Sequence, residues 1–179
     1  VPEAVTDGRI ESGKVAVLLE RIEELVVSGH KIAVFFNYLA GIELVGAGLE
    51  SIGIGYVTMT GATGDRERVV RRFQEDSEVQ VMLMTLKTGG VGLNLTAADC
   101  AFIFEPWWNK AAEEQAIGRL HRIGQTSKVM SFQMIALGTI EEKIIELQQK
   151  KKDLVDALIS SDRSMSKFLS QEDIDFILG

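Results

Sequence analysis

Short apolar segments rich in Val, Ile and Phe alternate with longer amphipathic segments along most of the chain. The short segments predict strands at residues 31–36, 55–59, 79–84, 100–104 and 129–136. Runs this short and this apolar are typical of parallel strands that are covered on both faces. The alternation therefore predicts an α/β fold, with strand–helix–strand units built around one parallel sheet.

The amphipathic segments predict helices at about residues 13–27, 40–51, 65–75 and 110–120. Ser12 and Thr63 are each placed to cap the start of one of these helices. A longer helix is predicted at residues 139–160, because apolar residues recur there at three- and four-residue spacing; they are Ile140, Ile144, Leu147, Leu154 and Leu158. This apolar face is expected to pack on the rest of the domain. Residues 170–178 predict a short acidic closing helix.

With 179 residues, the chain is long enough for one well-packed domain with a helical appendage. We expect a polar lead-in at residues 1–12, the domain itself at residues 13–137, and C-terminal helices at residues 138–179. No apolar run approaches the ~20 residues of a membrane-spanning helix, and no signal-peptide pattern begins the chain, so we expect an intracellular protein with no membrane contact. Because the sequence begins with Val1, we treat it as a fragment.

The net charge of −7 argues against a broadly basic, nucleic-acid-binding surface. Any contact with DNA would have to come from small basic patches, such as residues 66–72, 119–122 and 150–152. Cys100 is the single cysteine and lies in an apolar segment, so it is expected to be a small core residue. With only two histidines besides, no zinc site is expected, and no other metal ligand is assigned.

The spacing of Gly8, Gly13 and Lys14 imitates a phosphate loop, G-x-x-x-x-G-K. The next residue is Val15, where a Ser or Thr must hold magnesium, and no buried strand precedes the motif. We therefore reject a phosphate loop and expect Lys14 to be an exposed helix residue.

The chemistry-bearing segments lie between residues 85 and 125: T-L-K-T-G-G-V-G-L-N-L, then F-E-P-W-W-N, then E-E-Q-A-I-G-R-L-H-R-I-G-Q. The glycines from Gly89 to Gly92 follow a strand, where missing side chains allow close approach to phosphates or simply permit a turn. Arg119 and Arg122 are three residues apart on a predicted helix, so both can converge on one anion. The alternative is a solvated face, or an ion pair with Glu113 or Glu114.

Together these segments resemble helicase motifs five and six of the SWI/SNF-related branch of superfamily two. K-I-A-V-F-F-N-Y at residues 31–38 resembles motif four, G-A-T-G-D-R at residues 61–66 resembles the segment after it, and G-T-I-E-E-K-I at residues 138–144 resembles the closing helix. The resemblance implies a RecA-like three-layer fold: a parallel sheet with helices on both faces and a helical C-terminal extension. The end of the chain is most similar to prokaryotic members.

In this family the ATPase site is divided, so the resemblance implies that ATP and Mg²⁺ are held mainly by a preceding lobe that this sequence lacks. Arg119 and Arg122 match the arginine fingers, which stabilise charge on the transferring phosphoryl group. Gln115 matches the residue that opens motif six and helps to place the nucleotide or the arginines. The expected nucleotide contacts from motif five are Gly90, Gly92 and Asn94.

The resemblance also implies contacts with the phosphates of one strand of duplex DNA. The candidates are Asn37, Arg66, Thr85, Lys87 and Trp108. Core packing is the alternative for Trp108, and Trp107 is expected to pack. Lys110 stands where the family commonly has Pro, so the Trp-Asn loop is expected to be less rigid or to add a phosphate contact. Arg68, Arg71 and Arg72 are expected to form a solvated helix face.

These expectations describe the second lobe of an ATP-dependent double-stranded DNA translocase, acting in the nucleus or in the cytoplasm and nucleoid. Its partners would be the preceding lobe, duplex DNA and a DNA-bound protein target. One alternative is a strand-separating helicase or RNA-dependent ATPase of the same superfamily. The other is a docking module without catalysis.

Overall fold

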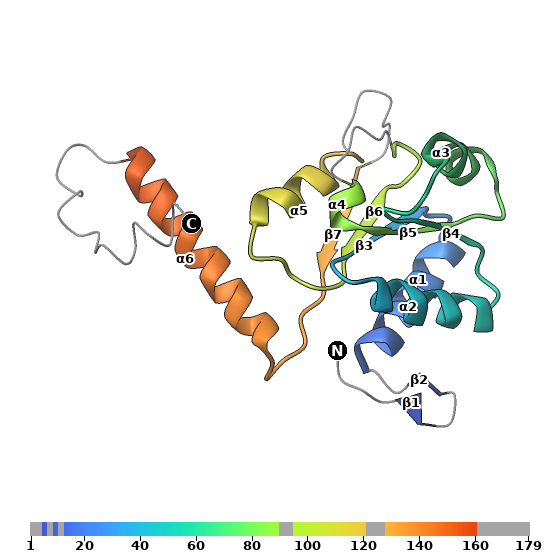
Figure 1. The fold of residues 1–179 in the computed structure, drawn as a ribbon, viewed down its shortest axis with the longest axis horizontal. Coiled ribbons are helices and arrows are strands. Elements are labelled where there is room, and N and C mark those ends of the chain that lie inside the picture. Colours follow the sequence, from blue (N-terminus) through green and yellow to red (C-terminus); the bar gives the residue numbers. More distant parts are fainter. Residues whose placement is uncertain (1–4, 7–8, 11–12, 90–94, 121–127, 161–179) are drawn as a thin grey trace.

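The structure is a computed structural model that describes residues 5–6, 9–10, 13–89, 95–120 and 128–160, drawn in colour in Figure 1. Among these residues, no helix is both long and apolar enough to cross a membrane. Arg122, Gly90, Gly92 and Asn94 lie outside the described residues, as do Ser12 and the closing helix expected at residues 170–178.

The core of the fold is a five-stranded sheet in the order β4-β5-β3-β6-β7. Its strands are β3 (Ile32–Phe36), β4 (Tyr56–Met59), β5 (Val81–Thr85), β6 (Cys100–Ile103) and β7 (Met130–Gln133). Every pairing within it is parallel. The strand order reverses beside β3, because the chain builds β4 and β5 on one side of β3 and then returns to add β6 and β7 on the other. The α/β prediction is confirmed.

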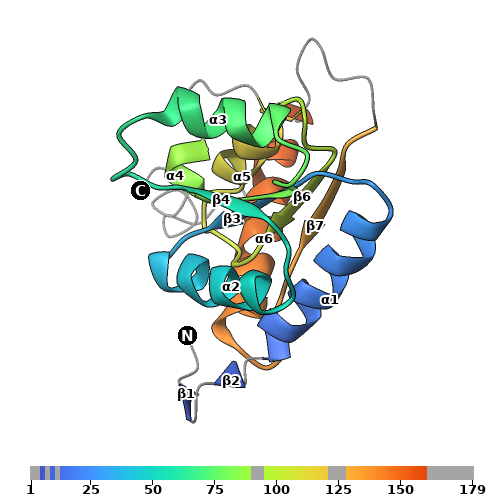
Figure 2. The ribbon, with the colours of Figure 1, turned by 90° about the vertical axis from the view of Figure 1, so that its right-hand side faces the viewer.

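Helices cover both faces of this sheet, as Figures 1 and 2 show. One face carries α1 (Gly13–Val27) and α2 (Leu39–Ser51). The other carries α3 (Arg66–Glu75), the short α4 (Leu86–Gly89) and α5 (Lys110–Ile117). The result is the predicted three-layer arrangement.

Alternation along β3 explains the two cores. Ile32, Val34 and Phe36 pack with the apolar sides of α1 and α2. Ala33 and Phe35 point to the opposite face and pack toward α3 and α5. All five side chains are buried, as expected for a central parallel strand.

Local sequence patterns missed three details. Residues 86–89 form α4 where a glycine turn was expected, and the lead-in contains a small antiparallel pair, β1 (Val5–Thr6) with β2 (Arg9–Ile10). The cap of α3 is Asp65, which accepts a hydrogen bond from the Arg68 N–H, so the expectation for Thr63 was wrong. Thr63 instead accepts a hydrogen bond from the N–H of Thr60, three residues earlier in the loop.

Helix α6 (Ile140–Ser160) projects from the lobe (Figure 1), and the apolar face expected to pack on the lobe is only partly covered, with Ile144 and Leu154 half-buried. Ile140 is 64% exposed and Leu147 is 37% exposed, whereas the polar Gln148 is buried. Helices α1 to α5 already cover both faces of the sheet, which leaves α6 to reach the lobe through polar side chains.

Lys14 provides one of these polar contacts, which corrects the expectation of an exposed residue. Its ammonium lies 2.6 Å from the Glu141 carboxylate and 4.9 Å from the centre of the Phe104 ring, and its side chain is only 13% exposed. Lys14 therefore ties the first turn of α1 to the start of α6, a structural use that differs from phosphate binding.

Gly55 precedes β4 at a point with no room for a side chain. A Cβ there would lie 1.8 Å from the backbone carbonyl oxygen of Glu78. We expect Gly55→Ala to lower the free energy of unfolding by about 3 kcal/mol, because backbone must move to relieve the overlap. Denaturant unfolding measures the change, with Gly64→Ala as the matched control, since a Cβ at Gly64 meets nothing within 4 Å. Equal stability of the two variants would contradict this close approach.

Candidate functional site

A pocket of about 480 Å³ opens at the carboxyl edge of the sheet. It is lined by Phe36, Asn37, Leu39, Gly61, Thr85, Leu86, Lys87, Thr88, Trp107, Ala112 and Gln115. Several of these residues end or follow β3, β5 and β6, the strands beside the reversal of strand order. Parallel α/β sheets bind ligands at this position, because the loops that follow adjacent strands diverge there.

The pocket brings together four of the residues predicted as site residues: Asn37, Thr85, Lys87 and Gln115. Arg66, Trp108 and Arg119 are described but are not among the lining residues. Arg66 is half-buried at the start of α3, and Trp108 is 61% exposed in the loop after β6. The exposure of Trp108 argues against the alternative of plain core packing.

Asn37 joins the ends of β3 and β6 through hydrogen bonds. Its side-chain Nδ2 donates hydrogen bonds to the backbone carbonyls of Glu105 (3.0 Å) and Pro106 (3.3 Å). Its backbone N–H donates to Glu105 Oε2 at 2.9 Å. Both amide hydrogens of the side chain are thereby directed to carbonyls, which leaves the Asn37 side-chain oxygen as the group that can face a ligand.

Glu105 is a site residue that sequence reasoning missed. Burial raises the pKa of its carboxyl group, while the hydrogen bond from Asn37 and the charge of Lys14 oppose that rise. The signal available in the sequence was an acidic residue placed directly after an apolar strand, in F-E-P-W-W-N. Its partners come from residues far away along the chain, so the spacing alone did not assign it a role.

Lys87 lies in the first turn of α4, directly after β5. Thr85 supports this turn, since its hydroxyl lies 2.6 Å from the Thr88 hydroxyl and accepts a hydrogen bond from the Thr88 N–H. Among the described residues that line the pocket, Lys87 has the one charged side chain, and it is exposed. The pocket therefore presents a cation at a mouth that is otherwise neutral.

The Trp-Asn loop (residues 107–109) is held against α5 by Glu113, a second carboxylate that sequence reasoning did not assign to the site. The Glu113 side chain is fully buried and accepts a hydrogen bond from the Trp107 N–H at 2.7 Å. Asn109 caps α5 by accepting from the Ala111 N–H. Trp107 packs in the core, as predicted, and meets the Trp108 ring edge-on at 6.3 Å.

Lys110 has a definite role in this loop. Its ammonium lies 2.8 Å from Glu113 Oε2 and 3.3 Å from Gln133 Oε1. Lys110 thus helps to fix the loop against β7, and the expected loss of rigidity at the missing proline is offset by these contacts.

Arg119 follows the end of α5 and is 9% exposed. Its backbone N–H donates to the Ala116 carbonyl, and its own carbonyl accepts from the Leu95 N–H at 3.3 Å. These bonds place Arg119 beside Leu95, the last residue of the motif-five segment. Gln115, in contrast, is exposed on α5 and reaches the pocket.

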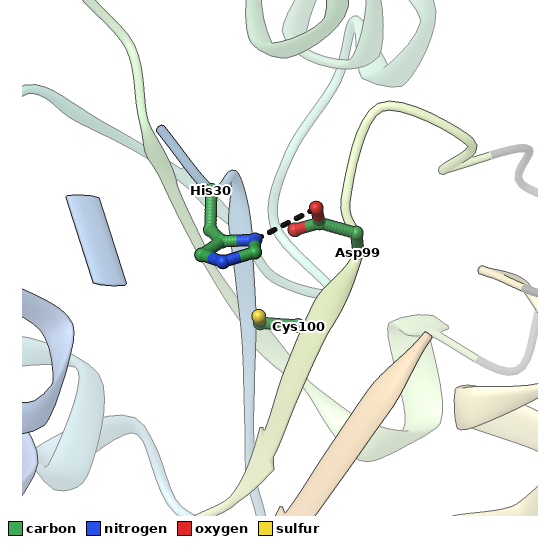
Figure 3. A group of neighbouring side chains, drawn as sticks. All are labelled: His30, Asp99 and Cys100. Carbon is green, nitrogen blue, oxygen red and sulfur yellow. Dashed lines mark hydrogen bonds and ion pairs between the residues drawn. The ribbon is translucent and has the colours of Figure 1, made fainter. Parts of the chain in front are cut away.

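A separate group of polar residues lies at the amino ends of the strands, away from the pocket (Figure 3). His30 Nδ1 lies 2.8 Å from Asp99 Oδ2, and the donor atoms of His30, Asp99 and Cys100 all lie within 4.8 Å of one another. The sequence-based exclusion of a zinc site counted only cysteine and histidine and so overlooked Asp99. Burial first, then the charge and a hydrogen bond of Asp99, raise the pKa of the buried Cys100 thiol to about 12, which favours a protonated thiol in a hydrogen-bonded clamp between the starts of β3 and β6.

Comparison with known families gives one match over most of the chain. Residues 13–124 match the family described as helicase conserved C-terminal domain. This range includes the pocket, the Trp-Asn loop and Arg119.

Curated relatives show the same similarity. The chain is 41% identical over 153 residues to DNA repair protein RAD5A of Arabidopsis thaliana, covering 84% of this chain and 15% of that protein. It is 34% identical over 173 residues to DNA repair protein rad8 of Schizosaccharomyces pombe (94% and 15%). It is 35% identical over 166 residues to the uncharacterized ATP-dependent helicase MG018 of Mycoplasma genitalium (92% and 16%). The chain thus spans less than a fifth of each of these relatives.

Among solved structures, the C-terminal part of the Fun30 ATPase domain has the same fold, with a TM-score of 0.76. The identity is 24%, and the match covers 98% of this chain and 54% of that one. At this identity the likeness establishes the RecA-like fold. The relatives come from a plant, a fungus and a mycoplasma, so they do not establish the expected prokaryotic origin.

The raised pKa of Cys100 predicts a specific loss of stability at alkaline pH. The thiol ionises near its ordinary value of 9 in the unfolded chain and at about 12 in the folded one. The folded state therefore holds its proton more tightly, so the stabilisation is fully present below pH 9 and is lost as the pH rises toward 12. We expect the free energy of unfolding to fall more steeply over this interval in the unmodified protein than in Cys100→Ala. Parallel pH profiles would contradict the assignment.

Proposed function

The chain belongs to the helicase conserved C-terminal domain family, and we propose that it is the second motor lobe of an ATP-dependent double-stranded DNA translocase of the SWI/SNF-related branch. The observation that carries the proposal is the pocket at the carboxyl edge. It gathers Asn37 from motif four, Thr85 and Lys87 from motif five and Gln115 from motif six. The relatives are named as DNA repair proteins and ATP-dependent helicases, which supports the choice of substrate.

The lining of the pocket fits a phosphate group better than a magnesium ion. Among the described lining residues there is one cation, Lys87, several hydroxyl and amide groups, and no carboxylate. Mg²⁺ prefers carboxylate and water ligands, so the metal would be held by groups outside this pocket. ATP with Mg²⁺, bound mainly by the preceding lobe, supplies the phosphoryl group whose transfer releases free energy.

Arg119 supplies the proposed catalytic charge. A guanidinium that approaches the transferring phosphoryl group stabilises its negative charge and raises the rate by on the order of 10³ to 10⁵. The Arg119 backbone is hydrogen-bonded to Ala116 and Leu95, so the side chain starts from a fixed position. Because the guanidinium is largely covered in this lobe, we infer that it becomes catalytically positioned only when the two lobes close. Arg122 is the second proposed finger and Gln115 the proposed helper, with Gly90, Gly92 and Asn94 as proposed nucleotide contacts.

For the DNA, the exposed groups are the strongest candidates. Lys87 offers a positive charge at the pocket mouth, and Trp108 offers an aromatic face from a loop fixed by Glu113. Arg66, Thr85 and Asn37 complete the proposed track, with Asn37 also holding the ends of β3 and β6 together. Contacts of this kind bind phosphates without reading base edges, which suits movement along any sequence. The proposed partners are thus the preceding lobe, duplex DNA and a DNA-bound protein target, in the nucleus or nucleoid.

The central experiment measures ATP hydrolysis by the full-length protein with and without duplex DNA. We expect stimulation by duplex DNA, and a loss in Arg119→Ala of on the order of 10³ in turnover with ATP binding nearly unchanged. Arg119→Lys, which keeps the positive charge, guards against a folding defect, and Arg21→Ala, on an exposed ion pair of α1, is the control. Absence of stimulation by duplex DNA in the unmodified protein would sink the proposal. Stimulation by single strands with strand separation would favour a helicase instead.

A second experiment separates DNA binding from chemistry. Lys87→Ala and Trp108→Ala should each raise the concentration of duplex DNA needed for half-maximal stimulation several-fold, while turnover at saturating DNA changes less. Lys87→Ala should also reduce the slope of log affinity against log salt concentration by about 1, since one phosphate contact is lost. The slope for Trp108→Ala should stay unchanged. An unchanged half-maximal concentration in both variants would remove them from the DNA track.

A further inference from the structure

The carboxylate of Glu113 is the point where four separate parts of the lobe meet. It is fully buried on α5 and accepts hydrogen bonds from four donors. These donors are the Trp107 N–H (2.7 Å), Lys110 Nζ (2.8 Å), Gln133 Nε2 (3.2 Å) and Gln148 Nε2 (3.1 Å). A buried carboxylate needs all its hydrogen-bond partners, because a lost partner leaves charge without compensation.

Two of the four donors, Gln133 and Gln148, come from elements that are far from α5 in the sequence. Trp107 belongs to the Trp-Asn loop, Gln133 to β7 and Gln148 to α6. Gln148 also donates a hydrogen bond to the Trp107 carbonyl, so its side chain bridges the loop and the carboxylate. The result is a four-way connection between α5, the Trp-Asn loop, β7 and α6.

The residues next to this connection are those proposed to work on DNA and ATP. Trp108 follows Trp107 directly and is exposed. Gln115 lies two positions after Glu113 on the same helix, and Arg119 follows the end of that helix. A shift of the Glu113 carboxylate would therefore move the DNA-facing loop and the helix that leads to the arginine together.

Helix α6 is attached to the lobe mainly through polar contacts. Its start is paired with Lys14 through Glu141, and Gln148 is its buried side chain among the described residues. Ile140, Leu147 and Val155 remain exposed, and the helix projects outward (Figure 1). Ile144 and Leu154 are only half-buried, so the buried Gln148 marks the closest polar attachment of α6 among the described residues.

We propose that Glu113 is a positioning residue for the ATPase cycle, and that Gln148 makes the Trp-Asn loop and α5 respond to the position of α6. This inference rests on the proposed function. It assigns no direct contact with ATP or DNA to either residue. One buried carboxylate, Glu113, thus holds the proposed DNA-binding loop and the proposed catalytic helix in a fixed relative position, and α6 supplies one of its hydrogen-bond donors.

The test uses the full-length protein with Glu113→Gln and Gln148→Ala. The matched controls are Glu114→Gln and Gln149→Ala, which alter the exposed neighbours on the same two helices. We expect Gln148→Ala to lower DNA-stimulated turnover by about tenfold and to raise the half-maximal DNA concentration, because small misplacements of an active group carry effects of this order. The KM for ATP should match that of Gln149→Ala, and turnover is measured well below the midpoint of thermal unfolding, since loss of a donor to a buried carboxylate lowers that midpoint. Glu113→Gln should show the same pattern, and the double variant should lose less than the sum of the two.

The possible results distinguish a failure of the proposed function from a failure of the positioning role. If the unmodified protein shows no stimulation by duplex DNA, the proposed function fails. If it is stimulated but both variants behave like their controls, the proposed function stands and the positioning role is overturned. A fall in turnover that only follows a lower unfolding midpoint, with the DNA dependence unchanged, also overturns it, because that pattern belongs to a structural residue.

Discussion

Burial of the sheet on both faces is the constraint from which the rest of the lobe follows. All five side chains of β3 are buried, alternately against α1 and α2 and against α3 and α5. A strand in this position has no solvent-facing side, so polar groups are confined to its two ends. Because every strand is parallel, the ends with one polarity meet at one edge. The pocket with Asn37, Thr85 and Lys87 lies at the carboxyl edge, and the His30–Asp99 clamp lies at the other.

The sequence could predict the strands and helices whose apolar residues follow a local pattern. The five strands and all helices except α4 lie close to their expected ranges, since a covered parallel strand reads as a continuous apolar run and apolar residues recur every three to four positions in a helix. Asn37, Thr85, Lys87 and Gln115 were identified through their motifs, and they do share a pocket. Where the pattern failed, a partner from a distant segment decided the outcome. Lys14 is covered because Glu141 lies beside it, and much of the apolar stripe of α6 stays exposed because the faces of the sheet are already occupied.

Two buried carboxylates illustrate why the site could not be completed from the sequence. Glu105 and Glu113 resemble ordinary surface acids in the amino-acid sequence. In the structure, Glu105 accepts a hydrogen bond from Asn37 at the end of β3, and Glu113 accepts hydrogen bonds from four donors. Their roles depend on donors that come together only in the folded lobe, and sequence spacing does not reveal those donors. An apolar core defines where the helices lie to within a packing distance, whereas directional hydrogen bonds define how a loop such as residues 107–109 is oriented. The lobe uses the first for its framework and the second for the edge where its chemistry is proposed.

The edge-on pair of tryptophans has a consequence for spectroscopy. The chain contains two tryptophans, and their ring centres lie 6.3 Å apart. Trp107 packs against the core, while Trp108 is 61% exposed. One indole is therefore half-covered by the core and the other faces solvent, close enough for excitation energy to pass between them. Quenching of the solvent-exposed Trp108 would report a ligand or a facing domain at the loop, while the half-buried Trp107 would report unfolding, without any added label.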